Sequence, residues 1–334
     1  MFAGLLAGSF GIVRAMGKNR LRQHVQSTSL NLQAMIGDAG LSAEEKDTWK
    51  EGWVKYQDTV YEYNEEMLTF LVMGIDKDSD AVAVSEGTSG GQADAIFLVA
   101  MNPEDKTVKV IAINRNTMTD IDIYNEEGAY VTTTKAQIAV QHGFGDGMEE
   151  SCSYQQKAVA NLFYNLPIHG YAAVNMSAIA TINDSVGGIK VNVLEDMTAI
   201  DADFVKDNQV HLIGEEAFWY VKYRDTNEFA SADTRLERQK QYLSTFMKVA
   251  KRAVKKDISV VLDLYEAISH QMVTDISLDE AVYLASIVSG YQFDESSFYT
   301  LQGETLMGEQ FEEFYPDEKA LYELILDIFY KEIE

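Results

Sequence analysis

Three short apolar runs stand out in the pattern of hydrophobic and polar positions along the first half of the chain. They are residues 68–75, 95–100 and 108–113, and each has the length of a buried strand bounded by turn residues. The turn at 102–105 is too short for a parallel crossover, so the second and third strands must be antiparallel. If the first pair is antiparallel too, the end of the first strand, the start of the second and the end of the third share one edge of the sheet.

The rest of the chain alternates between helical and extended patterns. Helical spacing is found over 151–165, 176–186, 215–224, from 232 onward, and over 260–272, 278–291 and 317–330. Extended patterns occupy 171–175, 189–193, 209–213 and 298–301. Apolar helices on such strands predict an α/β fold, a layered α/β/α sandwich with a mixed, partly antiparallel central sheet. We assign the main body to residues 67–332.

Residues 17–66 are predicted to form a helical arm. Ser42 and Glu45 have the spacing of a capping box at a helix start. Apolar and aromatic residues then recur in steps of four and three: Trp49, Trp53, Tyr56, Val60 and Tyr63. Such a stripe is typical of core packing, so we expect the arm to pack on the main body.

The first thirteen residues are apolar and uncharged, and Arg14, Lys18, Arg20 and Arg22 follow them. A membrane-spanning helix needs about 20 apolar residues, so this run is too short to cross a bilayer alone. A signal peptide would carry its positive charges before the apolar run. Two interpretations stay open: a short buried helix, or the trailing half of a membrane anchor.

The chain is strongly acidic, with 27 Lys and Arg against 53 Asp and Glu and a net charge of −26 over 334 residues. Such a surface repels nucleic acid and anionic lipid headgroups, so an anionic substrate requires a local basic site or a bound cation. Cys152 is the only cysteine, which excludes an internal disulfide and a cysteine zinc cluster. The five histidines show no metal-binding spacing, and there is no P-loop, dinucleotide fingerprint or nucleophile elbow.

Three charged residues belong to the shared strand edge. Asp76 follows the first strand, Asp94 precedes the second and Arg115 follows the third. Two converging carboxylates can hold a hard cation such as Mg²⁺, which also binds substrate phosphates. A nearby guanidinium would complete a binding site for a phosphoryl oxygen. The alternative is that both aspartates only mark strand boundaries.

A basic cluster interrupts the acidic sequence between residues 224 and 239. Arg235, Arg238 and Gln239 are separated by three and four positions, so they share one face of the predicted helix, and Arg224 precedes it closely. Guanidinium groups present paired donors that match phosphate oxygens. The alternative is a solvated basic face.

Six segments in a fixed order carry a family resemblance. They are Gly-Ile-Asp at 74–76, Gly-Gln-Ala-Asp at 91–94, Ile-Asn-Arg-Asn-Thr at 113–117, Asp-Ser-Val-Gly-Gly-Ile-Lys-Val at 184–191, the segment 214–224 ending in Lys-Tyr-Arg, and Arg-Leu-Glu-Arg-Gln at 235–239. In order and spacing the chain resembles the LytR-CpsA-Psr family of cell-wall glycopolymer ligases over roughly residues 67 to 330.

The resemblance implies a phosphotransferase on the outer side of the cell membrane of a Gram-positive type of bacterium, tethered by one N-terminal helix. Residues 1–16 are then expected to be part of that membrane anchor, and 17–66 a juxtamembrane arm. Such enzymes transfer teichoic acid, capsular or other wall polysaccharide from a polyprenyl pyrophosphate carrier to peptidoglycan. Typically the muramic acid C6 hydroxyl accepts it through a phosphodiester, with Mg²⁺ (or Mn²⁺) as cofactor. The polyprenyl chain lies in an apolar tunnel between sheet and helices.

Matched by position, Asp76 and Asp94 correspond to the family's metal-binding acids. The residues that correspond to its pyrophosphate-binding, catalytic set are Arg115, Arg224, Arg235 and Gln239, with Arg238 beside them.

Four positions depart from the pattern of many members: Gln92 replaces arginine, Asn114 proline, Asn116 aspartate and Lys222 arginine. Gln92 removes a positive charge from the substrate-binding pocket, and Lys222 keeps its charge without bidentate geometry. Asn116 keeps hydrogen bonding but cannot act as a base.

These departures keep two alternatives open: a non-catalytic binder of lipid-linked glycan, or a polyprenyl pyrophosphate pyrophosphatase. Binding of nucleic acid is not expected, given the net charge and the absence of a basic reading helix.

Overall fold

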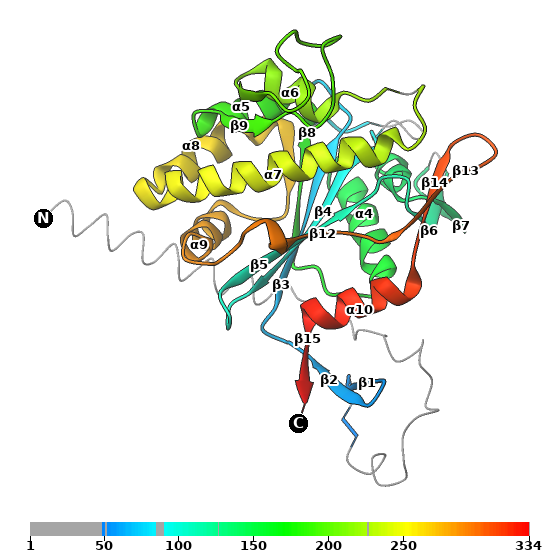
Figure 1. Ribbon diagram of the computed structural model, residues 1–334. Helices are drawn as coiled ribbons and strands as arrows, with labels where there is room; N and C mark the ends of the chain where they lie inside the picture. The colour runs from blue at the N-terminus through cyan, green and yellow to red at the C-terminus, as the bar shows by residue number, and fades with distance from the viewer. Residues whose placement is uncertain (1–48, 51, 85–89, 126, 226, 334) are drawn as a thin grey trace, which may run out of the picture.

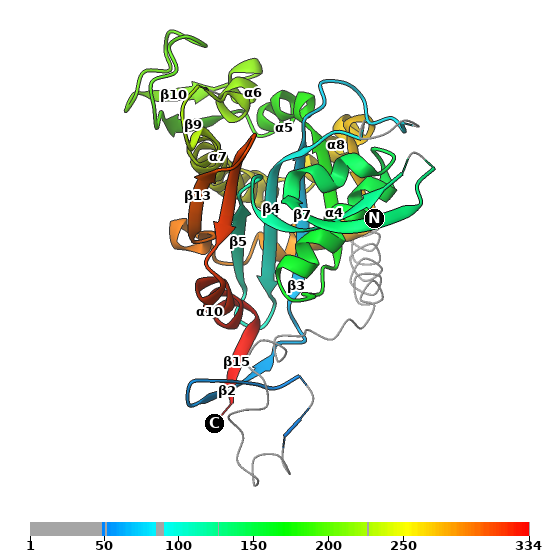
Figure 2. The same ribbon diagram turned by 90° about the vertical axis from the view of Figure 1, so that its right-hand side faces the viewer.

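A six-stranded mixed sheet forms the centre of the protein (Figures 1 and 2). The computed structural model describes residues 49–50, 52–84, 90–125, 127–225 and 227–333. The strands follow the order β11 (Met272–Thr274), β8 (Gly170–Asn175), β3 (Leu68–Ile75), β4 (Ala93–Asn102), β5 (Thr107–Ile113) and β12 (Phe298–Thr300). β3 pairs with β8 and β5 with β12 in parallel, and the other pairs are antiparallel. The predicted mixed sheet is confirmed.

The three central strands meet as their lengths and turns predict. β4 runs antiparallel to both β3 and β5. Ile75 at the end of β3 lies opposite Ala93 at the start of β4, and Ile96 lies opposite Ile113 at the end of β5. The residues that follow or precede these strand ends therefore gather at one edge of the sheet.

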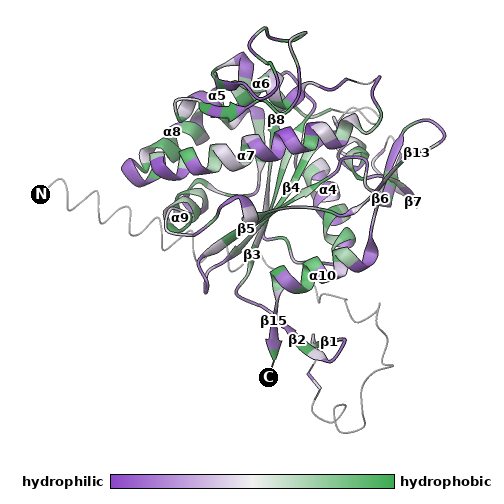
Figure 3. Cartoon of the chain, in the orientation of Figure 1, coloured by the Kyte–Doolittle hydropathy of each residue, from purple (hydrophilic) through white to green (hydrophobic). Residues whose placement is uncertain are grey.

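Helices cover both faces of the sheet. α7 (Ser231–Lys256) and α9 (Leu278–Val288) pack on one face, against a cluster that includes Phe97 and Val110. α4 (Glu149–Leu162) and α10 (Glu318–Phe329) pack on the other. The strands between them are mostly apolar (Figure 3), as expected for strands buried on both faces. The α/β/α layering is confirmed.

A smaller lobe adjoins the sheet beside α7 and has its own apolar cluster. It contains α5 (Ile179–Ser185), β9 (Ile189–Asn192), β10 (Gln209–Leu212) and α6 (Glu215–Lys222). α8 (Ser259–Ile268) follows α7, and 3₁₀ turns occupy Ile138–Phe144, Met176–Ala178, Ser269–Gln271 and Glu295–Ser297. α6 of this lobe ends at Lys222, and a short segment joins it to α7, whose first turns carry Arg235 and Arg238.

The helix predicted through residues 54–63 is wrong. The segment forms strands β1 (Val54–Tyr56) and β2 (Thr59–Tyr63), and β2 also pairs with β15 (Tyr330–Ile333) from the far end of the chain. Tyr, Val and Thr favour strands, and pairing with β15 outweighs the helical spacing of the aromatic residues. The predicted packing on the main body is confirmed for this described part of the arm, since the tilted rings of Tyr56 and Tyr322 lie 5.1 Å apart between centroids.

The capping box at 42–45 and the proposed anchor at 1–16 lie outside the described residues. Within the described ranges, no helix is long and apolar enough to span a membrane.

Two hairpins were not predicted from the sequence. They are β6 (Met118–Tyr124) with β7 (Tyr130–Gln137), and β13 (Gly303–Met307) with β14 (Glu312–Pro316). The hairpins adjoin each other, because Thr117 and Phe314 form a parallel bridge. In Figure 1 both lie on the right, at the end of α7 that carries its N-terminus. The β13–β14 hairpin proves important for the site.

Candidate active site

Asp94 joins two arginines from distant parts of the chain. Its Oδ1 lies 2.8 Å from Nε of Arg115, and its Oδ2 lies 2.9 Å from Nη1 of Arg235. Arg115 follows β5 and Arg235 lies in the second turn of α7, so the strand edge and the helix meet at this carboxylate. All three side chains are at most 15% exposed. The structure thus brings together residues that strand order and helical spacing predicted separately.

The third arginine of this cluster is Arg224, which follows α6. Its Nη2 lies 3.0 Å from Oε2 of Glu312, and its Nε donates to Ser231 Oγ at 2.9 Å. We call Arg115, Arg224 and Arg235 the arginine cluster. Sequence analysis missed Glu312, which lies in an acidic stretch with no recognisable motif. One signal in the sequence bears on its burial. Glu312 and the apolar Phe314 are two positions apart, so in a strand they lie on the same face, and Phe314 is expected to face the interior.

The environment of the arginine cluster favours an anion. Burial lowers the pKa of Arg115; Asp94 raises it, and the guanidiniums of Arg235 and Arg224 lower it. Among the described residues, the ion pairs of these three guanidiniums involve two carboxylates, those of Asp94 and Glu312. A bound phosphate would supply further negative charge and accept hydrogen bonds from the guanidiniums.

The side chain of Arg238 has a different position from the one predicted. It is 1% exposed, donates to the backbone carbonyls of Tyr220 and Tyr223, and pairs with Glu195 at 2.7 Å. Through these hydrogen bonds the guanidinium fixes the C-terminal end of α6. The guanidinium of Arg238 thus contacts the segment that carries Lys222 and Arg224, and its assignment to the catalytic set stays a prediction.

Gln239 is also buried, and its Nε2 donates to the carbonyl of Val221 at 3.2 Å. The solvated-face interpretation of this helix is wrong, because Arg235, Arg238 and Gln239 are all at most 6% exposed. The face is polar because it meets backbone carbonyls and carboxylates inside the protein.

Lys222 lies between two carboxylates of the segment after β3. Its Nζ is 2.9 Å from Asp78 Oδ1 and 3.7 Å from Asp76, and it lies 4.9 Å from the centroid of the Phe218 ring. Sequence analysis missed Asp78. The contact with Asp76 places Lys222 at the same sheet edge as Asp94.

Gln92 and Asn116 support the site through hydrogen bonds. Gln92 Oε1 accepts from Nη2 of Arg115. Asn116 is buried, its Oδ1 accepts from Gln137 at 3.1 Å, and its Nδ2 lies 3.5 Å from Glu312. Asn116 is bonded inside the protein, whereas Gln92 makes its hydrogen bond at the exposed rim of the site.

An apolar cavity of about 190 Å³ lies between the sheet and the helices. Its lining comes from β3, β4, β8, the 3₁₀ turn that starts at Met176, α5, α6 and α7: Val72, Met73, Gly74, Ala95, Phe97, Val174, Met176, Ile179, Ile182, Val221, Gln239, Tyr242, Leu243 and Phe246. Gln239 is the one polar side chain in this set, and it lies one helical turn from Arg235. The apolar cavity and the arginine cluster therefore adjoin along α7.

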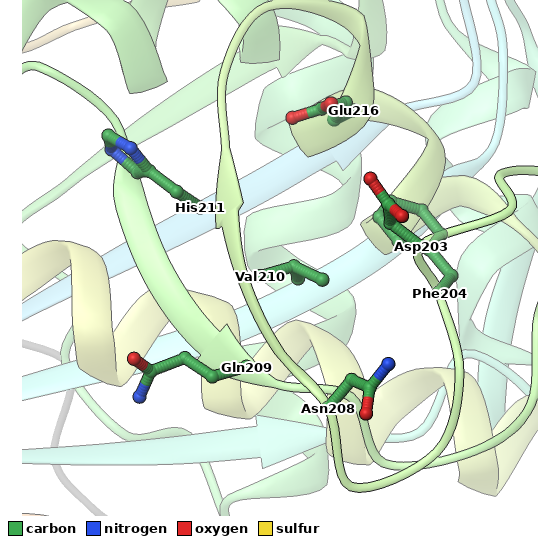
Figure 4. Close-up of a pocket in the computed structure, with 7 residues that line it drawn as sticks. All are labelled: Asp203, Phe204, Asn208, Gln209, Val210, His211 and Glu216. Carbon is green, nitrogen blue, oxygen red and sulfur yellow. The ribbon is translucent and has the colours of Figure 1, made fainter.

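A second hollow, of about 330 Å³, lies in the smaller lobe (Figure 4). Its lining residues are Asp203, Phe204, Asn208, Gln209, Val210, His211 and Glu216. None of these described residues is lysine or arginine, and two are carboxylates. The chemistry of this hollow does not suit a phosphate, so the arginine cluster is the better anion site.

The two predicted metal ligands, Asp76 and Asp94, have different surroundings. Asp76 is 52% exposed at the sheet edge and makes a long ion pair with Lys222, whereas both oxygens of Asp94 contact arginines. Nowhere in the described ranges do three or more His, Cys, Asp or Glu residues form a group that could hold a metal ion. Mg²⁺ commonly uses one or two carboxylates together with water and substrate phosphates. Asp76 is the more open of the two carboxylates for such an ion, because each oxygen of Asp94 is paired with an arginine.

The sequence model of the LytR_cpsA_psr family matches residues 34–325. The chain is 27% identical over 216 residues to the polyisoprenyl-teichoic acid–peptidoglycan teichoic acid transferase TagU of Bacillus cereus, covering 64% of this chain and 62% of that one. It is 26% identical over 222 residues to the corresponding TagV of Bacillus subtilis, covering 65% and 53%. The match thus spans less than two thirds of the length of these relatives.

Solved structures share the fold. The crystal structure of Bacillus subtilis TagV has a TM-score of 0.59 at 24% identity, covering 79% of this chain and 97% of that one. The structure titled TagT bound to LI-WTA has a TM-score of 0.57 at 19% identity, covering 79% and 90%. At these identities the likeness shows the α/β/α fold.

Proposed function

The chain belongs to the LytR-CpsA-Psr family, and from this membership we propose that it transfers a wall glycopolymer from a polyprenyl pyrophosphate carrier to peptidoglycan. One observation carries the proposal: the buried arginine cluster at Asp94 adjoins an apolar cavity. A polyprenyl pyrophosphate has both matching parts, an anionic diphosphate and an apolar chain. The names of TagU and TagV, which are teichoic acid transferases, favour teichoic acid as the glycopolymer.

The proposed reaction exchanges one phosphoester bond for another. A peptidoglycan hydroxyl oxygen bonds to the phosphorus that carries the glycopolymer, and the bond from that phosphorus to the bridging pyrophosphate oxygen breaks. Polyprenyl phosphate leaves, and the hydroxyl proton passes to solvent. Negative charge builds on the pyrophosphate as its bridge breaks, so fixed positive groups nearby lower the barrier.

The arginine cluster supplies those groups. Asp94 fixes Arg115 and Arg235 relative to each other, and the Arg224 guanidinium is held by Glu312 and Ser231. Preorganised donors need no reorientation when charge develops, which is the source of their catalytic effect. The apolar cavity would hold the part of the polyprenyl chain next to the pyrophosphate and so orient the bond that breaks.

We include Mg²⁺ or Mn²⁺ in the proposal, with Asp76 and Asp94 as the residues that would hold it. A bound divalent ion would neutralise charge on the phosphate oxygens. We also propose that the protein acts at the outer surface of the cell membrane, where lipid-linked glycopolymer and peptidoglycan are both present.

The test is an analysis of products with a synthetic lipid-linked teichoic acid and peptidoglycan fragments in the presence of Mg²⁺. A transferase yields polyprenyl phosphate and labelled peptidoglycan in equal amounts. A pyrophosphatase yields polyprenyl phosphate and free phosphorylated glycopolymer, even without acceptor. Retention of intact substrate without either product identifies a binder, and either of these last two results contradicts the proposal.

A further inference from the structure

Glu312 is a buried carboxylate at a position that no motif accounts for. It is 7% exposed, and its two oxygens accept from different parts of the site. Oε2 lies 3.0 Å from Nη2 of Arg224, and Oε1 accepts from the backbone N–H of Ala230 at 2.8 Å. Burying a charge is costly unless it is paired, so this geometry indicates a specific role.

Both contacts of Glu312 act on the start of α7. Ala230 is the residue that precedes this helix; it has a left-handed φ of 59° and makes no side-chain cap hydrogen bond. Ser231, the first residue of the helix, accepts from Nε of Arg224. Glu312 and Ser231 therefore hold the Arg224 guanidinium from two sides, and the carboxylate also fixes the backbone turn into α7.

The β13–β14 hairpin is connected to the site by further hydrogen bonds. Thr305 Oγ1 donates to Asp233 Oδ2 at 2.8 Å, and the other oxygen of Asp233 accepts from Asn114. The N–H of Phe314 donates to the carbonyl of Asn116 at 2.9 Å. The hairpin thus contacts both the segment after β5, which carries Arg115, and the first turn of α7, which directly precedes Arg235.

We propose that Glu312 is a positioning residue for the transfer reaction, which fixes Arg224 in the arginine cluster and makes the β13–β14 hairpin part of the site. The inference rests on the proposed function for its kinetic test. It predicts that removing the charge of Glu312 lowers kcat but raises the affinity for a diphosphate. Arg224 loses its orientation, which slows the chemical step, and it also loses a competing anion, which strengthens the binding of a diphosphate.

Glu312→Gln tests this with little change in shape. We expect kcat to fall by about 10-fold to 100-fold, as misplacement of one catalytic group does. We expect the affinity for farnesyl pyrophosphate, a short polyprenyl probe, to rise by about three-fold or more, because the Arg224 guanidinium is released from its ion pair with Glu312 and can bind the diphosphate instead. A residue that only supports folding would lower the active fraction without this division between affinity and kcat.

Glu313→Gln is the matched control. It removes the same charge from the neighbouring residue, which points to the opposite side of the strand and accepts from Tyr315. We expect its kcat and its affinity to stay within about two-fold of wild type.

An Arg224→Gln background shows whether Glu312 acts through Arg224. We expect Glu312→Gln to change neither kcat nor affinity further there. An equal effect on both backgrounds overturns the proposal, and so does a wild-type kcat in Glu312→Gln when Arg224→Gln is impaired. If the glutamine variant does not fold, Glu312→Asp, which keeps the charge but shortens the reach, is compared on both backgrounds by kcat alone: a fall on the wild-type background that is absent with Arg224→Gln supports the proposal, and an equal effect on both, or none, overturns it.

If the wild-type protein gives no transfer, the proposed function fails, and the inference is then decided by binding alone. The gain in farnesyl pyrophosphate affinity in Glu312→Gln must disappear on the Arg224→Gln background. A gain that persists there, or no gain on either background, overturns the role of Glu312.

Discussion

Asp94→Asn tests whether the Asp94 carboxylate stabilises the folded protein by balancing the positive charges of the neighbouring guanidiniums. Asparagine keeps the size of the side chain and one acceptor oxygen but removes the charge that pairs with Arg115 and Arg235 at 2.8 and 2.9 Å. Breaking a buried ion pair costs about 3–5 kcal/mol, because the remaining charge is left without its partner. The retained acceptor oxygen and the residual exposure of the pair favour the lower end, about 3 kcal/mol.

The assay is thermal unfolding of both proteins at the same pH and ionic strength. For a chain of this size, about 3 kcal/mol corresponds to a Tm lower by roughly 5 °C. Inorganic pyrophosphate should stabilise the variant more than the wild type, because it replaces the missing negative charge beside the arginines. Asp76→Asn serves as the control at the same sheet edge. Its carboxylate is half exposed with one long ion pair, so its loss should cost under about 1 kcal/mol.

Two results would refute this reasoning. One is a Tm of Asp94→Asn equal to that of Asp76→Asn, which would mean that the arginines do not depend on the carboxylate. The other is equal stabilisation of variant and wild type by pyrophosphate, which would place the anion elsewhere.

Three further predictions concern the surroundings of the site. Arg238→Met should lower the free energy of unfolding by about 3 kcal/mol in urea titration, because the carbonyls of Tyr220 and Tyr223 lose their donor. Val72→Trp should fill the apolar cavity and weaken farnesyl pyrophosphate binding by about 10-fold while leaving inorganic pyrophosphate unaffected in calorimetry. Burial lowers the pKa of His142 below its ordinary value of 6.5. Below about pH 6.5 the unfolded chain therefore binds a proton that the folded chain does not, and the free energy of unfolding falls as the pH drops. His142→Asn should reduce that loss, measured by urea unfolding at pH 7.5 and 5.5, by up to about 1.4 kcal/mol per pH unit.

Much of the site followed from local pattern. Strand length and a short turn were enough to place Asp94 beside Arg115, because antiparallel pairing fixes which strand ends meet. Helical spacing placed Arg235 and Gln239 on one face of α7, and both are buried on it. In each case the information is contained in one continuous segment or in two joined by a short turn.

The parts that sequence could not predict depend on contacts between distant segments. Glu312 reaches Arg224 across 88 positions, and β15 pairs with β2 from the opposite end of the chain. Arg238 has the same spacing signal as Arg235, yet its guanidinium meets carbonyls of α6 instead of Asp94. Helical spacing assigns a residue to a face, but the partner on that face depends on tertiary packing.

The most direct test of the central claim compares Arg115→Ala with wild type in the transfer of lipid-linked teichoic acid to peptidoglycan. Loss of one preorganised donor should lower kcat by about 10²–10³-fold. The apolar cavity is untouched, so binding of a polyprenol without phosphate should stay unchanged. Wild-type kcat in Arg115→Ala would contradict the assignment of the arginine cluster as the site that binds the pyrophosphate.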